Sequence, residues 1–195
     1  IAANQHRDAI RSIGVDTWGV DFSFVTKNDA LLTEPVCHRD ARTKGLIEKA
    51  AATVSKKETF EATGLQFLEI NTLYQLLAIK RDQPELLAAA DRLLMIPDLM
   101  HWLLSGQRSN ERTIASTTQC FDSRKGQWAN SLLDQFGIPT SLFQQVSEPG
   151  HNIGSLRTDI AADTGLRDVQ IVLPGSHDTA SAVAAVPALE PPPSR

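Results

Sequence analysis

The sequence predicts an α/β fold, and three observations support this. Alternating apolar residues predict strands near both ends of the chain, within 12–26 and at 169–173. Between them, the stretch 43–104 has the spacing of amphipathic helices, and strands on either side of a helical middle are typical of α/β domains. The 195 residues, 42% hydrophobic and 22% charged, have the composition of a globular domain and exclude a disordered chain or a coiled coil.

The first predicted strands lie within 12–26 and change register along the way. Apolar residues occupy odd positions over 13–15 and even positions over 20–24. Strand side chains alternate with period two, so this change of parity indicates a turn or bulge between the two runs. Gly19 lies at the change, where the missing side chain allows a positive φ and the close approach of another group.

The middle of the chain is predicted to be helical. One helix is expected over 46–54, and a second begins at the N-cap candidate Asn71. Two more carry Pro84 and Pro97 in their first turns, and Gly106 ends the last of them. The polar stretch that follows predicts a loop with little regular structure, and two shorter helices come after it. These three segments are 107–128, 129–136 and 139–145.

The last predicted strand, 169–173, is ended by Pro174 and Gly175. Ser176 is then the N-cap candidate of a helix of small residues that stops before Pro187. In open α/β sheets, ligands bind beyond the carboxyl ends of the strands. The polar start of this helix is therefore a candidate binding site.

Charge and cysteine usage narrow the classes of function. Lys and Arg number 19 against 23 Asp and Glu, and a net charge of −4 without a basic run argues against nucleic-acid or anionic-membrane partners. No stretch approaches the ~18 consecutive apolar residues of a membrane span. Cys37 and Cys120 are far apart and form no C-x-x-C pair, which argues against a disulfide framework and suits a reducing cytoplasm.

The polar start of the last helix offers one candidate catalytic residue, Asp178. Together with Ser176 and His177 it suggests a nucleophilic triad, but adjacent residues at a helix start point about 100° apart and are not expected to relay a proton. Alone, an aspartate in the first turn is a weak base, because the helix dipole favours its ionised form. A weak base suits phosphoryl transfer, since the loose transition state of that reaction mainly needs an oriented hydroxyl. By local pattern alone, an acid that merely complements the helix dipole is the commoner case.

The segment 16–22, DTWGVDF, is a second candidate site. Beside Gly19, the indole of Trp18 could form one wall of a polyol pocket, its face covering sugar C–H groups. Equally, Trp18 could belong to the core, with Asp16 and Asp21 as turn residues. The residue types leave both interpretations open.

The segment C-H-R-D-A-R-T is expected to be structural. Cys37 and His38 are adjacent, too tight a pair to bind one zinc ion by both side chains, and no second pair of ligands exists in the sequence. Arg39, Asp40 and Arg42 are expected to form an ion-pair network at a helix start. No residue of this chain is thereby assigned to a metal.

Five motifs, in order along the chain, resemble the rhamnulokinases, a group within the FGGY carbohydrate kinases. The likeness covers about residues 10 to 188. DTWGVDF together with SHDTASAV distinguishes this chain from xylulokinases and glycerol kinases, which carry other residues at the equivalent sugar-site turn. The five motifs are SIGVDTWGVDF (12–22), PVCHRDARTKG (35–45), TGLQFLEINTLYQL (63–76), LLMIPDLMHWLLSG (93–106) and PGSHDTASAVAAVP (174–187).

The resemblance implies a ribonuclease H-like, actin-type ATPase lobe, a mixed sheet with flanking helices. It also implies phosphorylation of L-rhamnulose to L-rhamnulose 1-phosphate in rhamnose catabolism, with ATP and Mg²⁺ as cofactors. Asp178 is implied as the proton acceptor, and Gly19, His177, Asp178 and Thr179 as sugar-binding residues. The alternatives are another FGGY kinase, for fuculose, xylulose or a related sugar, and a non-catalytic sugar-binding module.

Two features of such kinases are expected to lie outside this chain. No glycine-rich phosphate loop precedes Ile1, and no second lobe, which carries most of the nucleotide pocket, follows Pro187. We therefore expect residues 1–188 to form an N-terminal lobe that lacks its first hairpin, and 189–195 to be a disordered or non-native tail. ATP and Mg²⁺ are assigned no residues here, and the isolated fragment is expected to be inactive.

Overall fold

A mixed three-stranded sheet brings together the two ends of the described chain. The computed structural model describes residues 9–187, so the predicted tail at 189–195 lies outside the described residues. The strand order is β1 (Ser12–Ile13), β9 (Gln170–Val172), β8 (Asn152–Ser155). β1 runs parallel to β9 and β8 runs antiparallel to it, which confirms both predicted end strands and the mixed sheet.

A second pair of strands lies in the middle of the fold. β2 (Phe22–Val25) runs antiparallel to β3 (Arg92–Met95), with Phe22 opposite Met95. All four β2 residues are buried, so both faces of this strand are covered. Two shorter pairs are β4 (Asn110–Glu111) with β7 (Val146–Ser147), which are parallel, and β5 (Phe121–Asp122) with β6 (Gln127–Trp128), which are antiparallel.

Several helices begin and end at the predicted residues. Asn71 is the N-cap of α4, Pro84 and Pro97 lie in the first turns of α5 and α6, and Gly106 ends α6 in the left-handed conformation. No helix among residues 9–187 has the length and apolar character that crossing a membrane requires. The helices are α2 (Leu46–Ala51), α3 (Lys56–Thr63), α4 (Thr72–Asp82), α5 (Pro84–Ala89), α6 (Ile96–Ser105), α7 (Arg112–Ala115), α8 (Asn130–Gln135), α9 (Thr158–Thr164) and α10 (Asp178–Ala184).

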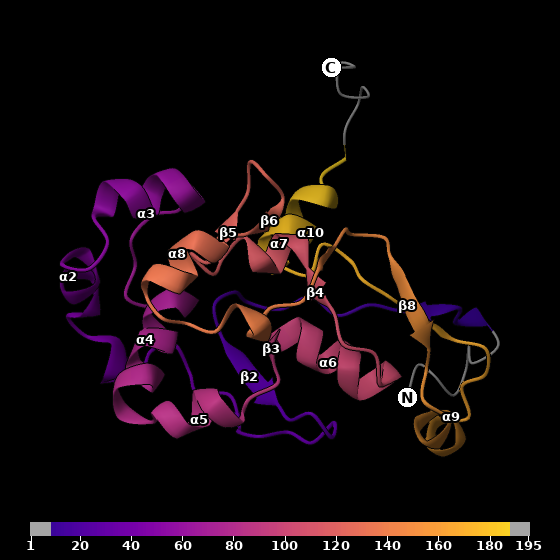
Figure 1. Ribbon diagram of the computed structural model, residues 1–195. Coiled ribbons are helices and arrows are strands. Elements are labelled where there is room, and N and C mark those ends of the chain that lie inside the picture. Colours follow the sequence, from indigo (N-terminus) through magenta and orange to yellow (C-terminus); the bar gives the residue numbers. More distant parts are fainter. Residues whose placement is uncertain (1–8, 188–195) are drawn as a thin grey trace.

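The three-stranded sheet and α9 lie at one end of the molecule, and α2 and α3 lie at the other (Figure 1). The largest apolar cluster joins β2 and β3 to α4 and α8. Its fully buried members include Phe24 of β2, Leu93 of β3, Leu73 and Leu76 of α4 and Leu133 of α8. Burial of each such side chain stabilises the fold by about 1.5–3 kcal/mol, so this cluster is the main support of the central strands.

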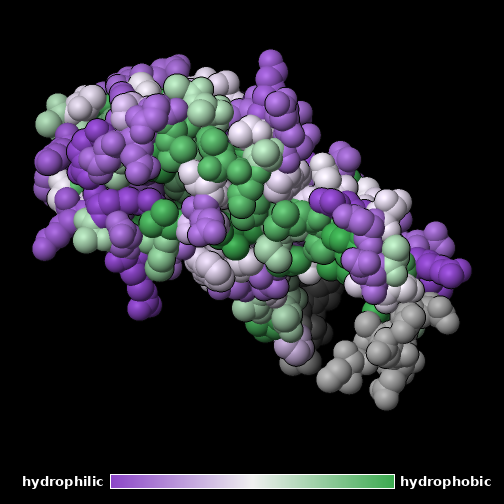
Figure 2. Space-filling model, turned by 90° about the horizontal axis from the view of Figure 1, so that it is seen from below, coloured by the Kyte–Doolittle hydropathy of each residue, from purple (hydrophilic) through white to green (hydrophobic). Residues whose placement is uncertain are grey.

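Helix α6 connects the central strands to the end sheet. Leu99 and Trp102 pack with Val25 of β2, and α6 also contacts β8 and β9. Met100 and Leu103 on its other side are exposed. Figure 2, which views the molecule from below, shows apolar side chains gathered along the middle of that face.

The segment 107–128 differs from the irregular loop that was predicted. It contains β4, α7, β5 and β6, each only two to four residues long, so no period is detectable in the sequence. Its polar side chains Asn110, Glu111 and Gln119 are fully buried. They are tolerated there because they bond to backbone and side-chain groups, as Asn110 Nδ2 does to the carbonyl of Leu93 and the carboxylate of Asp98, each at 3.3 Å.

Three further differences concern the chain after residue 128. The helix predicted over 129–136 is present as α8, but 139–145 holds only a 3₁₀ turn, Thr140–Leu142. β8 and α9 were not predicted. The N-cap of α10 is His177 and not Ser176, whose hydroxyl instead donates to the carbonyl of Pro174 at 3.4 Å.

The predicted ion-pair network in the segment C-H-R-D-A-R-T is absent from the described residues. Asp40 instead caps the 3₁₀ turn Ala41–Thr43 by accepting a hydrogen bond from the backbone N–H of Arg42. The Arg42 guanidinium donates to Gln75 Oε1 at 2.7 Å, and burial lowers the pKa of Arg42. The local sequence correctly indicated a helical turn, but the partner of Arg42 lies on α4.

Candidate functional site

The two candidate segments of the sequence lie side by side. The backbone N–H of Thr17 donates to the carbonyl of Ser176 at 3.0 Å, and the N–H of Asp178 donates to the carbonyl of Thr17 at 2.9 Å. These two bonds form a parallel bridge between Thr17 and His177. The turn after β1 and the start of α10 therefore share one site, although they come from opposite ends of the chain.

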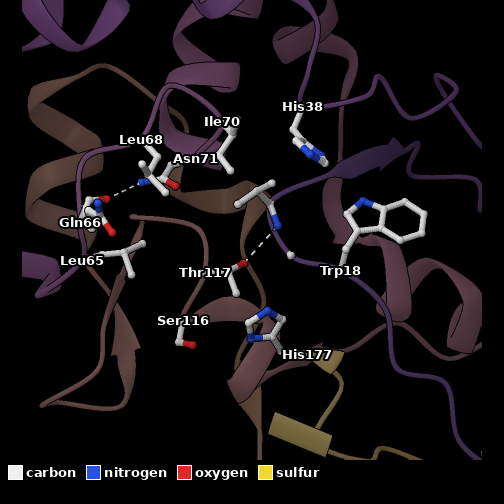
Figure 3. Close-up of a pocket in the computed structure, with 12 residues that line it drawn as sticks. Trp18, His38, Leu65, Gln66, Leu68, Ile70, Asn71, Ser116, Thr117 and His177 are labelled. Carbon is white, nitrogen blue, oxygen red and sulfur yellow. Dashed lines mark hydrogen bonds between the residues drawn. The ribbon is translucent and has the colours of Figure 1, made fainter. Parts of the chain in front are cut away.

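A cavity of about 390 Å³ opens beside this bridge (Figure 3). Its walls come from the turn before β2, the segment around His38, the loop between α3 and α4, the residues just after α7 and the start of α10. The apolar part of the wall is concentrated in the α3–α4 loop, and polar groups come from the other segments. The lining residues are Trp18, Gly19, Val20, His38, Leu65, Gln66, Leu68, Ile70, Asn71, Ser116, Thr117 and His177.

Trp18 is 50% exposed and lines the cavity, so the alternative that placed it in the core is wrong. Its indole Nε1 donates to Asp21 Oδ2 at 2.9 Å, which fixes the orientation of the ring. Asp21 is only 3% exposed, and it is thus a buried carboxylate under the cavity wall. The interpretation of Trp18 as a pocket wall agrees with this placement.

Gly19 is required by a close approach. A Cβ at this position would lie 2.9 Å from Cβ, Cγ2 and Oγ1 of Thr117. The hydroxyl of Thr117 accepts a hydrogen bond from the backbone N–H of Val20 at 3.2 Å, shown as a dashed line in Figure 3. The close approach was predicted correctly, but the positive φ in this turn, 69°, belongs to Val20.

The start of α10 carries the remaining predicted site residues. His177 lines the cavity, whereas Thr179 lines a neighbouring cavity of about 500 Å³ that also contains His177 and Arg112. Asp178 lies between them, with its side chain 53% exposed, and Oδ1 accepts hydrogen bonds from the backbone N–H and hydroxyl of Thr179 at 2.6 and 3.2 Å. The structure thus brings Gly19 and His177 into one cavity and Thr179 into the neighbouring one, whereas Asp178 lines neither of the two.

His177 and Asp178 approach each other, contrary to the expectation that adjacent residues point apart. His177 Nε2 lies 3.4 Å from Asp178 Oδ1. The reason is that His177 is the N-cap, with an extended backbone (φ −79°, ψ 124°), so the helical angle of 100° does not apply to this pair. Ser176 is buried, and its hydroxyl donates to the carbonyl of Pro174; no hydrogen bond links it to the His177 ring among residues 9–187, so the hydrolase triad remains rejected.

Buried polar groups hold the start of α10 in place. Glu111 is fully buried, and its Oε2 accepts from the backbone N–H of Ser176 at 3.1 Å and from the hydroxyl of Thr113 at 2.6 Å. Thr113 Oγ1 in turn accepts from the backbone N–H of His177 at 3.1 Å. The first residues of α10 are therefore tied to the first turn of α7.

Helix α6 supplies two buried polar groups behind the site. His101 Nε2 accepts from the backbone N–H of Val15 at 3.0 Å, and burial lowers the pKa of His101 to about 4. Asp98 Oδ1 accepts from the backbone N–H of Glu111 at 3.0 Å, and burial raises the pKa of Asp98 well above its ordinary value. The two side chains attach α6 to the segment after β1, which leads into the site, and to the start of α7.

His38, Asn71 and Thr117 also line the cavity, and the sequence pattern does not indicate them. His38 Nδ1 lies 3.0 Å from Asp21 Oδ2, and its ring lies beside Trp18 in Figure 3. These residues come from loops and helix ends whose local patterns say nothing about a common site. The one available signal was the position of His38 and Asn71 within the family-like motifs.

The ligand atoms of Asp21, Cys37 and His38 lie within 4.8 Å of one another, the one such group of three among residues 9–187. A thiolate, an imidazole and a carboxylate suit zinc, whereas Mg²⁺ prefers oxygen ligands. Asp21 Oδ2 already accepts from Trp18 Nε1 at 2.9 Å and lies 3.0 Å from His38 Nδ1. This group of three therefore does not suit Mg²⁺, and no residue is assigned here to ATP or a metal.

Comparison with known sequences identifies relatives along nearly the whole chain. Residues 1–185 match the N-terminal domain of the FGGY family of carbohydrate kinases. A rhamnulokinase from Oceanobacillus iheyensis is 41% identical over 179 residues, 92% of this chain and 38% of the relative. A rhamnulokinase from Yersinia pestis (strain Pestoides F) is 41% identical over 182 residues, 93% of this chain and 36% of the relative. This chain thus spans little more than a third of their length.

Solved structures share the fold at lower sequence identity. A carbohydrate kinase from Novosphingobium aromaticivorans superposes with a TM-score of 0.80 at 22% identity, covering 94% of this chain and 39% of that one. A xylulose kinase from Lactobacillus acidophilus gives a TM-score of 0.76 at 19% identity, with 88% and 36% covered. The likeness confirms the predicted α/β lobe of the actin-type ATPase fold, present here as a partial domain.

Proposed function

Because the chain belongs to the FGGY family of carbohydrate kinases, we propose that it is the sugar-binding part of an ATP-dependent kinase for L-rhamnulose. The observation that carries this proposal is the cavity beside the Thr17–His177 bridge, which is lined by Gly19 and His177, two of the family-like motif residues. The 41% identity to rhamnulokinases supports L-rhamnulose over other ketoses.

The chemistry of the cavity suits a 6-deoxyketose. Leu65, Leu68 and Ile70 form an apolar wall that can cover a methyl group, and the exposed face of Trp18 can cover sugar C–H groups. Opposite polar groups, such as the imidazole of His177, can bind hydroxyls. A ligand with one methyl end and several hydroxyls makes use of both kinds of wall.

Asp178 is proposed to accept the proton of the sugar hydroxyl that is phosphorylated. Its carboxylate accepts hydrogen bonds from Thr179 and lies next to the imidazole of His177, which lines the cavity. Phosphoryl transfer has a loose transition state, so the carboxylate mainly orients the hydroxyl for in-line attack. ATP supplies the phosphoryl group when it is bound.

Calorimetric titration of the chain with sugars tests the binding half of the proposal. We expect L-rhamnulose to bind more tightly than L-fructose, which differs from it only by a hydroxyl at C6, because that hydroxyl would be buried against the apolar wall without a partner. Equal or better binding of L-fructose would contradict the assignment of the apolar wall to the methyl group.

Turnover is tested in a protein that carries this chain together with the remaining length of the relatives. We expect ATP-dependent phosphorylation of L-rhamnulose in preference to L-fuculose, xylulose and glycerol. A preference of tenfold or more in kcat/KM for one of these three, about 1.4 kcal/mol, would assign the protein to another sugar kinase of the family. Sugar binding without phosphoryl transfer would identify a non-catalytic binding module.

A further inference from the structure

The buried carboxylate of Asp21 joins two walls of the cavity without lining it. Oδ2 accepts from Trp18 Nε1 at 2.9 Å and lies 3.0 Å from His38 Nδ1. Oδ1 accepts from Gln75 Nε2 at 3.3 Å. Trp18 and His38 both line the cavity, whereas Asp21 lies behind them.

The hydrogen-bond network determines which atom of His38 carries a proton. The Gln75 amide can have only one orientation, since its Oε1 accepts from Arg42 and its Nε2 donates to the carbonyls of Val20 and Ile70. Gln75 and the indole N–H of Trp18 therefore donate to Asp21, which acts as an acceptor. His38 Nδ1 must then be the donor to Asp21, and the neutral ring presents Nε2 as an acceptor.

The free atom of His38 is available to the cavity. The ring is about three quarters buried in the cavity wall, and Nε2 has no hydrogen-bond partner within residues 9–187. In Figure 3 the ring points from its loop toward Trp18. An oriented acceptor on the wall of a cavity is a means of distinguishing hydroxyl positions, because a hydroxyl that misses it leaves a polar group unpaired.

We propose that Asp21 is a positioning residue that orients Trp18 and His38, and that His38 determines sugar specificity by accepting a hydrogen bond from one sugar hydroxyl at Nε2. The second half of this inference rests on the proposed function, since it requires a sugar in the cavity. The first half concerns the chain without ligand and is testable by itself.

NMR of the histidine ring nitrogens tests the positioning half. In the wild-type chain we expect His38 as the Nδ1–H tautomer, with its signals assigned through their loss in His38→Gln. In Asp21→Ala no acceptor holds the proton on Nδ1, so we expect both tautomers of His38 to be populated. Retention of the pure wild-type tautomer in Asp21→Ala would overturn the positioning role, and that result does not depend on any sugar.

Calorimetry with L-rhamnulose and its epimers at C3, C4 and C5 tests the specificity half. His38→Phe removes one hydrogen bond, so we expect affinity for L-rhamnulose to fall about 2- to 10-fold. One sugar carbon carries the hydroxyl that donates to His38. In His38→Phe we expect the ratio of the affinities for L-rhamnulose and for its epimer at that carbon to fall toward one. Asp21→Ala should lower the same ratio, and the double variant should add little, because Asp21 acts on this ratio through His38.

Cys37→Ser is the matched control, since Cys37 is adjacent, exposed and not a lining residue. It should leave every epimer ratio unchanged. Epimer ratios in His38→Phe that equal those of the wild type would overturn the specificity role. A wild-type chain that binds none of these sugars would instead overturn the proposed function, and with it the sugar-dependent half of this inference.

Discussion

At the scale of single residues, Asp178 carries the sharpest prediction. Asp178→Asn keeps the shape of the side chain but removes its charge and its capacity to accept a proton. In a protein of the relatives' length, we expect kcat to fall about 10²–10⁴-fold with little change in sugar binding, the usual effect of losing a positioned acid–base group. Steady-state kinetics and calorimetry measure the two quantities separately.

The opposite pattern would assign Asp178 a structural role only. An acid that merely complements the dipole of α10 contributes about 0.3–1 kcal/mol to stability, so its loss would lower the free energy of unfolding and leave kcat almost intact. Normal turnover of Asp178→Asn would remove this residue from the mechanism.

Gly19→Ala probes the close approach of two segments. The added Cβ would lie 2.9 Å from three atoms of Thr117, so either the turn or the segment just after α7 must move. We expect a loss of about 1–3 kcal/mol in the free energy of unfolding, together with weaker sugar binding. Urea unfolding and calorimetry measure both, and Ser116→Ala, at another lining residue, is the control that should keep stability near that of the wild type. Unchanged stability and affinity in Gly19→Ala would contradict the required approach.

At the scale of elements, Glu111 connects the first turns of α7 and α10. Its carboxylate accepts from the backbone N–H groups of Thr113, Ile114 and Ser176, at 2.8, 3.1 and 3.1 Å. Glu111→Gln places an N–H₂ group where these donors converge, so at least one bond is lost in a fully buried position. We expect a loss of about 2–4 kcal/mol in the free energy of unfolding, measured by urea denaturation.

Glu148→Gln is the matched control for this prediction. Glu148 pairs with Arg112 of the same helix α7, but its side chain is 66% exposed. Exposed ion pairs contribute about 0–1 kcal/mol, so the control should unfold almost like the wild type. Similar losses in the two variants would show that burial of Glu111 does not decide its contribution.

At the scale of the whole molecule, His101 links stability to pH. Burial lowers its pKa to about 4 from an ordinary value of 6.5. Between these values the unfolded chain binds a proton that the folded chain does not, so the free energy of unfolding falls as the pH falls from 6.5 toward 4. The difference of about 2.5 units corresponds to about 3 kcal/mol at the acid end of this window.

His101→Gln isolates this contribution, because an amide does not titrate and its oxygen can still accept from Val15. Urea denaturation at pH 7.5 and pH 5 should show a smaller loss on acidification in the variant than in the wild type. Burial raises the pKa of Asp98, and a raised carboxyl pKa acts in the opposite direction, with stability lost as the pH rises; this contribution remains in both proteins. His151 is exposed, and His151→Gln is the control that should lose as much stability on acidification as the wild type does.

Features that depend only on residues adjacent in the sequence could be predicted from the sequence alone. Pro84 and Pro97 indicated two helix starts and Gly106 a helix end, because these residues restrict or permit particular backbone angles whatever surrounds them. The motifs around Gly19 and His177 are contiguous runs of the sequence, so they indicated the family without any knowledge of the fold. The alternation over 20–24 likewise indicated β2, as each apolar residue there has a neighbour two positions away.

Only the tertiary structure decided how distant residues share one site. The parallel bridge of Thr17 and His177 unites two segments from opposite ends of the chain. The contact of His38 with Asp21 turns two unremarkable polar residues into part of a cavity wall. The exposure of Trp18 could not be predicted for the same reason. Burial is set by which elements pack against a residue, and the energy of that packing comes from long-range contacts that no local period encodes.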